Sequence, residues 1–201
     1  MITKSALKIK KSCGFTLLEL MVVLAIAAIL ATLAAPSVIQ FVTRSAMQSV
    51  SNDFIGAIQR ARTEAVTRNM CATICKSNTT SNAAPRCTPG AAGVYTANDW
   101  HMGWIVFRNP SCERTITVSD PADVGDIIIV RQPGDERYQL FSPTGGGNLR
   151  SMTFGPQGAM ASFGNFKLKD SGNTGSALNR VVCVSVLGRA RILADDAVCV
   201  P

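Results

Sequence analysis

The sequence predicts an α+β protein in which a long N-terminal hydrophobic helix packs on an antiparallel β-sheet domain. No charged side chain occurs from Leu20 to Thr43, and apolar residues recur beyond it at spacings of three or four, which is the period of a helix. From Met70 onward, short β-prone runs alternate with clusters of Gly, Pro, Asn and Asp. Because no long helical period recurs after Met70, a helix followed by a sheet is the arrangement we expect.

The helix is preceded by a basic leader, residues 1–14, which has four lysines and no acidic residue. The uncharged segment after it is long enough to span a bilayer, since about 20 apolar helical residues cross a hydrocarbon core of about 30 Å. Positive charge marks the cytoplasmic end of a membrane span, so residues after Thr43 should lie on the opposite side. Without Lys4, Lys8, Lys10 and Lys11, 16 basic residues face 13 acidic ones, so the net charge falls from +7 to +3. Most of the basicity is therefore a topology signal and not a nucleic-acid signal.

We expect the helix to continue to about Asn69, with a transmembrane half at 15–43 and an amphipathic half at 44–69. Pro36 removes a backbone donor, which predicts a bend or a locally melted turn there. The remaining residues, 70–201, should form the sheet domain. The predicted strands are Ala72–Cys75, Trp104–Phe107, Ile127–Val130, Ser151–Phe154, Ala159–Phe163 and Val181–Val186. The polar segment Ser77–Gly93 is expected to be an irregular loop stapled at Cys87.

Seven cysteines are present, and Cys13 belongs to the leader. The other six are an even number in a domain expected to be exported, which favours disulfides. We expect the pairs Cys75–Cys87, Cys183–Cys199 and Cys71–Cys112. A metal site is the weaker reading, because Cys71-x-x-x-Cys75 has no second matching pair and His101 is the only histidine.

The motif at the head of the apolar run, Gly14-Phe15-Thr16-Leu17-Leu18-Glu19, decides between two kinds of N-terminus. An ordinary secretory signal would be cut after the run, near Ala31, Ala34 and Ala35. Such a signal has no use for Glu19, a carboxylate inside an apolar segment, where a charge is costly and usually has a partner.

Gly14 followed by Phe-Thr-Leu-Leu-Glu-Leu-Met-Val-Val resembles the type IV prepilin motif of type IV pilins and type II secretion pseudopilins. The resemblance implies that prepilin peptidase cuts between Gly14 and Phe15 and methylates the new N-terminus at Phe15. It implies that Glu19 meets the N-terminal amine of a neighbouring subunit, and that Pro36 bends the helix. The implied partners are the peptidase, the inner membrane and other major and minor pilins, which pack helix against helix.

Four further segments resemble the GspH/FimT group, in its FimT/FimU-like form. They are Ala61–Asn69, Trp100–Phe107, Phe141–Gly145 and Ser185–Arg191. The resemblance implies a minor type IV pilin, single-pass in the inner membrane with a periplasmic domain, that enters a cell-surface pilus in a tip or assembly-initiation complex. Two alternatives stay open: a pilus-borne DNA-binding protein for natural transformation, and a minor pseudopilin of a type II secretion system.

The DNA alternative depends on Gly188, Arg189 and Arg191. In an extended strand, side chains two apart point to the same side, so both guanidinium groups can face one phosphate backbone. Lys167, Lys169 and Arg180 would extend such a patch. A solvated hairpin, with salt bridges to Asp195 and Asp196, is the competing interpretation.

No enzyme, cofactor or metal is expected from the sequence. It contains no Ser/His/Asp spacing, paired carboxylates or phosphate loop, and Gly145-Gly146-Gly147 is interpreted as a turn. Trp100 and Trp104 have the spacing to stack on bases, but we interpret them, with His101, as packing residues at the start of a strand.

Overall fold

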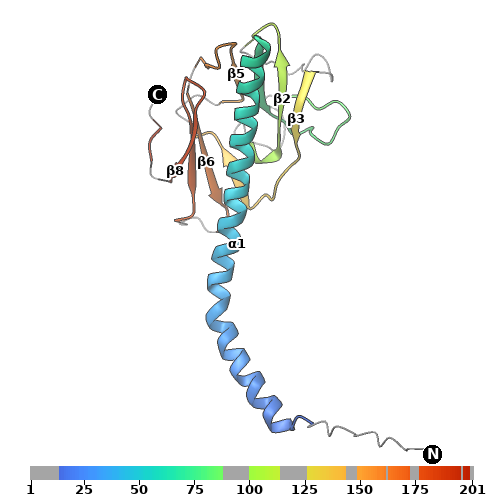
Figure 1. Ribbon diagram of the computed structural model, residues 1–201, viewed down its shortest axis with the longest axis vertical. Coiled ribbons are helices and arrows are strands. Elements are labelled where there is room, and N and C mark those ends of the chain that lie inside the picture. The colour runs from blue at the N-terminus through green and yellow to red at the C-terminus, as the bar shows by residue number, and fades with distance from the viewer. Residues whose placement is uncertain are drawn as a thin grey trace, which may run out of the picture. The chain divides into compact units, whose positions relative to one another are not determined.

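The computed structural model of the chain, shown in Figure 1, describes residues 14–87, 100–113, 126–143, 149–161, 163–172, 177–195 and 197–199. The chain forms two compact units, Met1–Thr43 and Arg44–Pro201. One helix, α1 (Leu17–Arg68), supplies the described helix of the first unit and the packed helix of the second.

In the first unit, α1 begins at a Thr16 cap. The Thr16 hydroxyl accepts a hydrogen bond from the backbone N–H of Glu19 at 3.2 Å, and the Thr16 carbonyl accepts one from Leu20 at 3.1 Å. The helix continues without interruption through position 36, so the predicted local melting is wrong. Thr32 and Ser37 donate their hydroxyls to helix carbonyls on either side of the proline, and such bonds help a helix to tolerate it.

The side chains of this unit have almost no partner within the chain. Every residue from Gly14 to Val42 whose side chain is described is exposed, including Phe15, Leu33 and Phe41 at 72%, 73% and 72%. By length and composition, α1 can cross a membrane.

In the second unit, α1 is amphipathic, as predicted. Its buried stripe recurs at helical spacing and comprises Met47, Phe54, Ile58, Ala61 and Ala65. The helix ends at Arg68, and Asn69 adopts the left-handed conformation at φ 51°. Met70 then donates to the Ala65 carbonyl at 3.2 Å, which satisfies a carbonyl of the last turn.

The described strands form two four-stranded antiparallel sheets. The first has the order β3 (Ile127–Arg131), β2 (Trp104–Asn109), β1 (Cys71–Lys76) and β5 (Ser151–Phe154). The second has the order β4 (Tyr138–Phe141), β6 (Gly164–Asp170), β7 (Arg180–Val184) and β8 (Ala190–Ala194). In Figure 1 both sheets lie along the C-terminal half of α1.

An aromatic cluster lies where the helix meets the two sheets. Phe54 makes edge-to-face contacts with Trp100, Trp104 and Phe166 at centroid distances of 5.4, 5.2 and 4.8 Å. Trp100 starts the short 3-10 helix η1 (Trp100–Met102) and donates its indole N–H to the Leu149 carbonyl at 3.0 Å. Both tryptophans are buried, which confirms the packing interpretation.

Five of the six predicted strands are present, with shifted ends. The strand predicted at Ala159–Phe163 is wrong: only Met160 forms an isolated bridge, to Phe154, and the strand begins at Gly164. The physical reason is a reverse turn at Gly158, which has φ 74° and leads the chain into this segment. The prediction also missed β4, β6 and β8.

The six described cysteines form the three pairs expected from the sequence: Cys71–Cys112, Cys75–Cys87 and Cys183–Cys199. Their Cα atoms lie 5.1, 5.6 and 5.5 Å apart, in the usual range for a disulfide.

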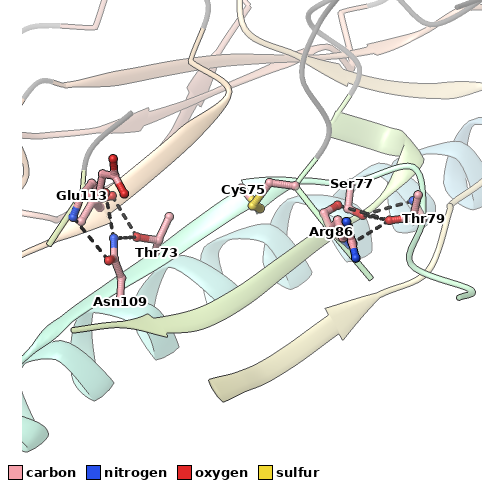
Figure 2. Close-up of a disulfide and its surroundings, with 9 residues drawn as sticks. Thr73, Cys75, Ser77, Thr79, Arg86, Asn109 and Glu113 are labelled. Atoms are coloured by element: carbon pink, nitrogen blue, oxygen red, sulfur yellow. Dashed lines mark hydrogen bonds between the residues drawn. A yellow bond between two sulfur atoms is a disulfide. The ribbon is translucent and has the colours of Figure 1, made fainter. Parts of the chain in front are cut away.

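Polar side chains hold the chain beside two of these bridges, as Figure 2 shows. Asn109 donates to the Thr73 hydroxyl at 3.0 Å and to the Glu113 carbonyl at 2.8 Å, which fixes the turn around Cys112. Thr79 accepts from the Arg86 N–H at 2.8 Å, next to Cys87. The loop predicted at Ser77–Gly93 is irregular up to Cys87, and its remainder lies outside the described residues.

Candidate functional site

The predicted processing site lies in an extended, exposed segment. Gly14 and Phe15 precede the first helical residue, Leu17, and no neighbouring atom lies within 4 Å of the place where a Gly14 Cβ would stand. The peptide bond between them is therefore outside the helix and open to a protease. The leader before Gly14 lies outside the described residues.

Glu19 occupies the first turn of α1, where a carboxylate interacts favourably with the positive end of the helix dipole. It is exposed, and its backbone N–H is the one that Thr16 caps. Sequence reasoning missed this second role, although the Thr16-x-x-Glu19 spacing is that of a capping box. The motif thus also starts the helix.

A tight turn, Ser185–Arg189, positions the C-terminal arginines between β7 and β8. Gly188 donates to the Ser185 carbonyl at 2.8 Å, and Ser185 donates to the Arg189 carbonyl at 2.9 Å. Gly188 has φ 72°, a conformation that glycine adopts readily. It is also buried, and a Cβ there would contact Gly158 and Arg62. Its lack of a side chain therefore serves the packing of the chain itself.

Arg189 and Arg191 line one concavity of about 430 Å³, which we call the arginine hollow. Its lining residues are Gln59, Arg62, Gly188, Arg189, Ala190 and Arg191. In the part of the chain that the structure describes, neither arginine forms an ion pair. Asp195 instead accepts a hydrogen bond from Asn179 at 3.1 Å, so the expected salt bridge is not formed there, and Asp196 lies outside the described residues.

The other predicted basic residues do not line the arginine hollow. Lys169 lies over the Phe141 ring at 5.5 Å, and Lys167 pairs in register with Phe141 and Val181 in the sheet. Arg180 donates to the carbonyls of Ala177 and Asn179 and lines a separate hollow that includes Arg44.

Arg62 of α1 is the lining residue that sequence reasoning missed. It is separated by 96 positions from Gly158, whose carbonyl accepts a hydrogen bond from its Nε at 3.2 Å. Only the packing of α1 on the sheet turns brings it beside Arg189, and nothing local in the sequence signals that.

Two buried carboxylates support the fold around these sites. Glu64 accepts from Arg108 at 2.9 Å and pairs with Arg68, and the Arg108 hydrogen bond is the main cause that lowers the pKa of Glu64. Asp170 accepts two bonds from Arg137, at 2.9 and 3.0 Å, which lower the pKa of Asp170 and raise that of Arg137. Both pairs are structural: they link α1 to β2 and β4 to β6.

The described residues offer no grouping of three or more His, Cys, Asp or Glu side chains suited to a metal ion. All the described cysteines are in disulfides, and His101 has a buried Nδ1 without a partner at the end of η1. The buried tryptophans do not present faces for base stacking.

A long N-terminal helix with an exposed apolar half, followed by a helix half packed on antiparallel sheets, defines a pilin-like structural protein. Two family models match the chain: "Type II transport protein GspH" at residues 50–188 and "Prokaryotic N-terminal methylation motif" at residues 9–35. The chain belongs to the GspH family of minor type IV pilins and pseudopilins. Proteins of this family and fold are structural components and not enzymes.

Solved structures of one pilin resemble the chain. The type IV minor pilin FimU of Pseudomonas aeruginosa, in one crystal form, is 16% identical, with 78% of this chain and 98% of that chain covered and a TM-score of 0.52. A second crystal form gives 15% identity, coverage of 75% and 98%, and a TM-score of 0.49. The first likeness shows the same fold. No curated protein sequence matches the chain.

Proposed function

We propose that this chain is a minor type IV pilin, cut after Gly14 by prepilin peptidase, methylated at Phe15 and incorporated into a pilus in a tip or assembly-initiation complex. The observation that carries the proposal is the run of exposed apolar side chains from Phe15 to Val42, headed by the single carboxylate of Glu19. The inner membrane holds the helix before assembly, with the domain in the periplasm, and other pilins cover it afterwards.

The energetics of this helix support both environments. Burial of one Val, Leu, Ile, Phe or Met side chain is worth about 1.5–3 kcal/mol. The first unit buries none of its apolar side chains within the chain, so the whole of that free energy depends on lipid or on neighbouring helices. An N-terminal amine of a neighbouring pilin would neutralise Glu19 once lipid and water are excluded.

The test is Glu19→Ala in the full chain. Membrane insertion should be unchanged, because the apolar span is intact, while incorporation into sheared pili should fall strongly. The matched control is Glu136→Ala, which removes an exposed carboxylate from a turn of the sheet domain. The measurement is immunoblotting of membrane and sheared-pilus fractions, and incorporation of Glu19→Ala at the control level would refute the assignment.

A second candidate function is DNA binding on the pilus for natural transformation. The observation that favours it is the arginine hollow, in which Arg189 and Arg191 lie together and form no ion pair within the described part of the chain. A gel-shift comparison of the chain with its Arg189→Gln/Arg191→Gln variant tests it. Binding should be weakened in the variant and by added salt, and no shift of the unchanged chain at low salt would end this candidate.

A role as minor pseudopilin is favoured by the description of the matching family model, which names a type II transport protein. Deletion of the chain separates the two roles. Loss of pili with normal protein secretion supports the pilus assignment, and loss of secretion with normal pili replaces it.

A further inference from the structure

Two hairpin turns of the same construction lie against α1, at Gly155–Ala159 and Ser185–Arg189, and we call them the paired turns. In each, the first residue donates to the carbonyl of the fifth, at 2.9 Å in both cases. In each, the fourth residue is a left-handed glycine, Gly158 at φ 74° or Gly188 at φ 72°, and donates to the carbonyl of the first at 2.7 or 2.8 Å. Met160 donates to the Val186 carbonyl at 2.7 Å and joins the two turns.

The Arg62 side chain runs along both glycines. Its Nε donates to the Gly158 carbonyl at 3.2 Å. A Cβ on Gly158 would stand 2.9 Å from Arg62 Nε, and a Cβ on Gly188 would stand 3.0 Å from Arg62 Cδ. The two glycines therefore leave the space that Arg62 occupies, and the paired turns fix its direction.

This arrangement places three guanidinium groups around one hollow. Arg62, Arg189 and Arg191 all line it, the remaining lining residues are Gln59, Gly188 and Ala190, and none is a carboxylate. The Gly158 carbonyl uses only one edge of the Arg62 fork, and the terminal nitrogens have no partner among the described residues. Like charges gathered without a counter-charge raise the local potential and attract an anion.

We propose that Arg62 is a third phosphate-contacting residue of the arginine hollow, so that three arginines from α1 and the Ser185–Arg189 turn bind the phosphodiester backbone of a nucleic acid. The inference depends on the second candidate function, DNA binding. Guanidinium forks suit phosphate oxygens. No aromatic side chain lines the hollow, so it offers nothing on which unpaired bases stack, and binding to duplex DNA should be independent of sequence.

The test measures affinity of the full chain, in a nonionic detergent, for a fluorescent DNA duplex of mixed sequence by anisotropy at several salt concentrations. Arg62→Gln should bind about tenfold more weakly, the usual effect of losing one charged hydrogen bond. The slope of log affinity against log salt should fall by about 0.9, the value for one phosphate contact. Arg60→Gln is the matched control, since it removes an equal charge from an exposed position on the same helix outside the hollow, and it should leave both quantities nearly unchanged.

Arg62 also holds the paired turns, so a second variant separates binding from support of the fold. Arg62→Lys keeps the charge and should retain most of the salt slope, whereas a purely structural role predicts that Gln and Lys weaken binding alike with an unaltered slope. Unchanged binding by Arg62→Gln, with loss in the Arg189→Gln/Arg191→Gln variant, overturns the Arg62 inference and keeps the candidate function. No binding by the unchanged chain at low salt overturns both.

Discussion

At the scale of single residues, two glycines of the same helix-and-turn region have opposite requirements. Gly188 is buried at φ 72°, and an added methyl would run into the Gly158 carbonyl. Gly56 lies on the exposed face of α1, and nothing lies within 4 Å of the place where an added methyl would stand. The first is needed by the backbone, whereas the second only adds freedom to the unfolded chain.

We therefore predict opposite signs for two alanine substitutions. Gly188→Ala should lower the free energy of unfolding by about 1–2 kcal/mol from the left-handed conformation alone, with a further loss from the steric conflict. Gly56→Ala should raise it by about 0.5–1 kcal/mol, because alanine favours a helix interior. Urea denaturation measures both, and a Gly188→Ala variant as stable as the parent chain would contradict the turn geometry.

Glu64 gives a prediction about acid stability. Its pKa in the folded chain is lowered, chiefly by the Arg108 hydrogen bond, so its pairs stabilise the fold fully above the unfolded value of about 4.3. The contribution is lost as the pH falls from there through the folded pKa. Glu64→Gln should cost about 1.5–3 kcal/mol near pH 7 and reduce the pH dependence below about 4.3. Denaturation at several pH values measures it, with Glu136→Gln as the control, and an equal acid slope in both variants would refute this role.

Residue-level prediction from sequence was uneven for physical reasons. The tryptophans could be placed in the core because large aromatic side chains next to a β-prone run rarely stay exposed. Arg62 could not be placed, because its neighbours are turns that lie 96 and more positions away and meet it only through tertiary packing.

At the scale of elements, the helix was predictable and the strands only in part. The period of α1 continues over many turns, so its end was found within a residue. Strand β6 was missed although Phe166 and Leu168 are buried and alternate with Lys167 and Lys169, because lysines weaken a hydrophobic signal that period-two analysis would have kept. Strand β8 has no buried position to reveal it.

The Cys183–Cys199 bridge holds the C-terminal segment on the second sheet, and its removal should be costly. The two cysteines are 16 positions apart, and closing a loop of that size in the unfolded chain is worth about 3 kcal/mol. Cys183→Ser/Cys199→Ser should lose about that much stability in urea denaturation. Chemical reduction of the double variant should then cost less than reduction of the parent chain. Equal midpoints for variant and parent would show that the bridge contributes nothing.

At the scale of the whole molecule, the two units meet different physical demands. The second has its own core, with Phe54, Ile58, Phe166 and Val182 among its buried residues. The first buries no apolar side chain within the chain and needs a partner. The sequence could divide these demands because charge is absent from one segment and hydrophobic periodicity marks the other. It could not show how the domain's turns assemble a basic surface, since that depends on contacts between distant segments.

This division predicts that residues 44–201 alone are a soluble, cooperatively folding monomer. The core residues of the second unit all lie beyond Thr43, and its three disulfides lie there too, so deletion of residues 1–43 removes little of what stabilises it. The deletion also removes the exposed apolar side chains that should make the full chain dependent on detergent. Gel filtration without detergent should give a monomer, and calorimetry should give one transition within a few degrees of that of the full chain in detergent. A molten or aggregated fragment, shown by dye binding or by a broad transition, would mean that the first half of the helix stabilises the domain and would contradict this division.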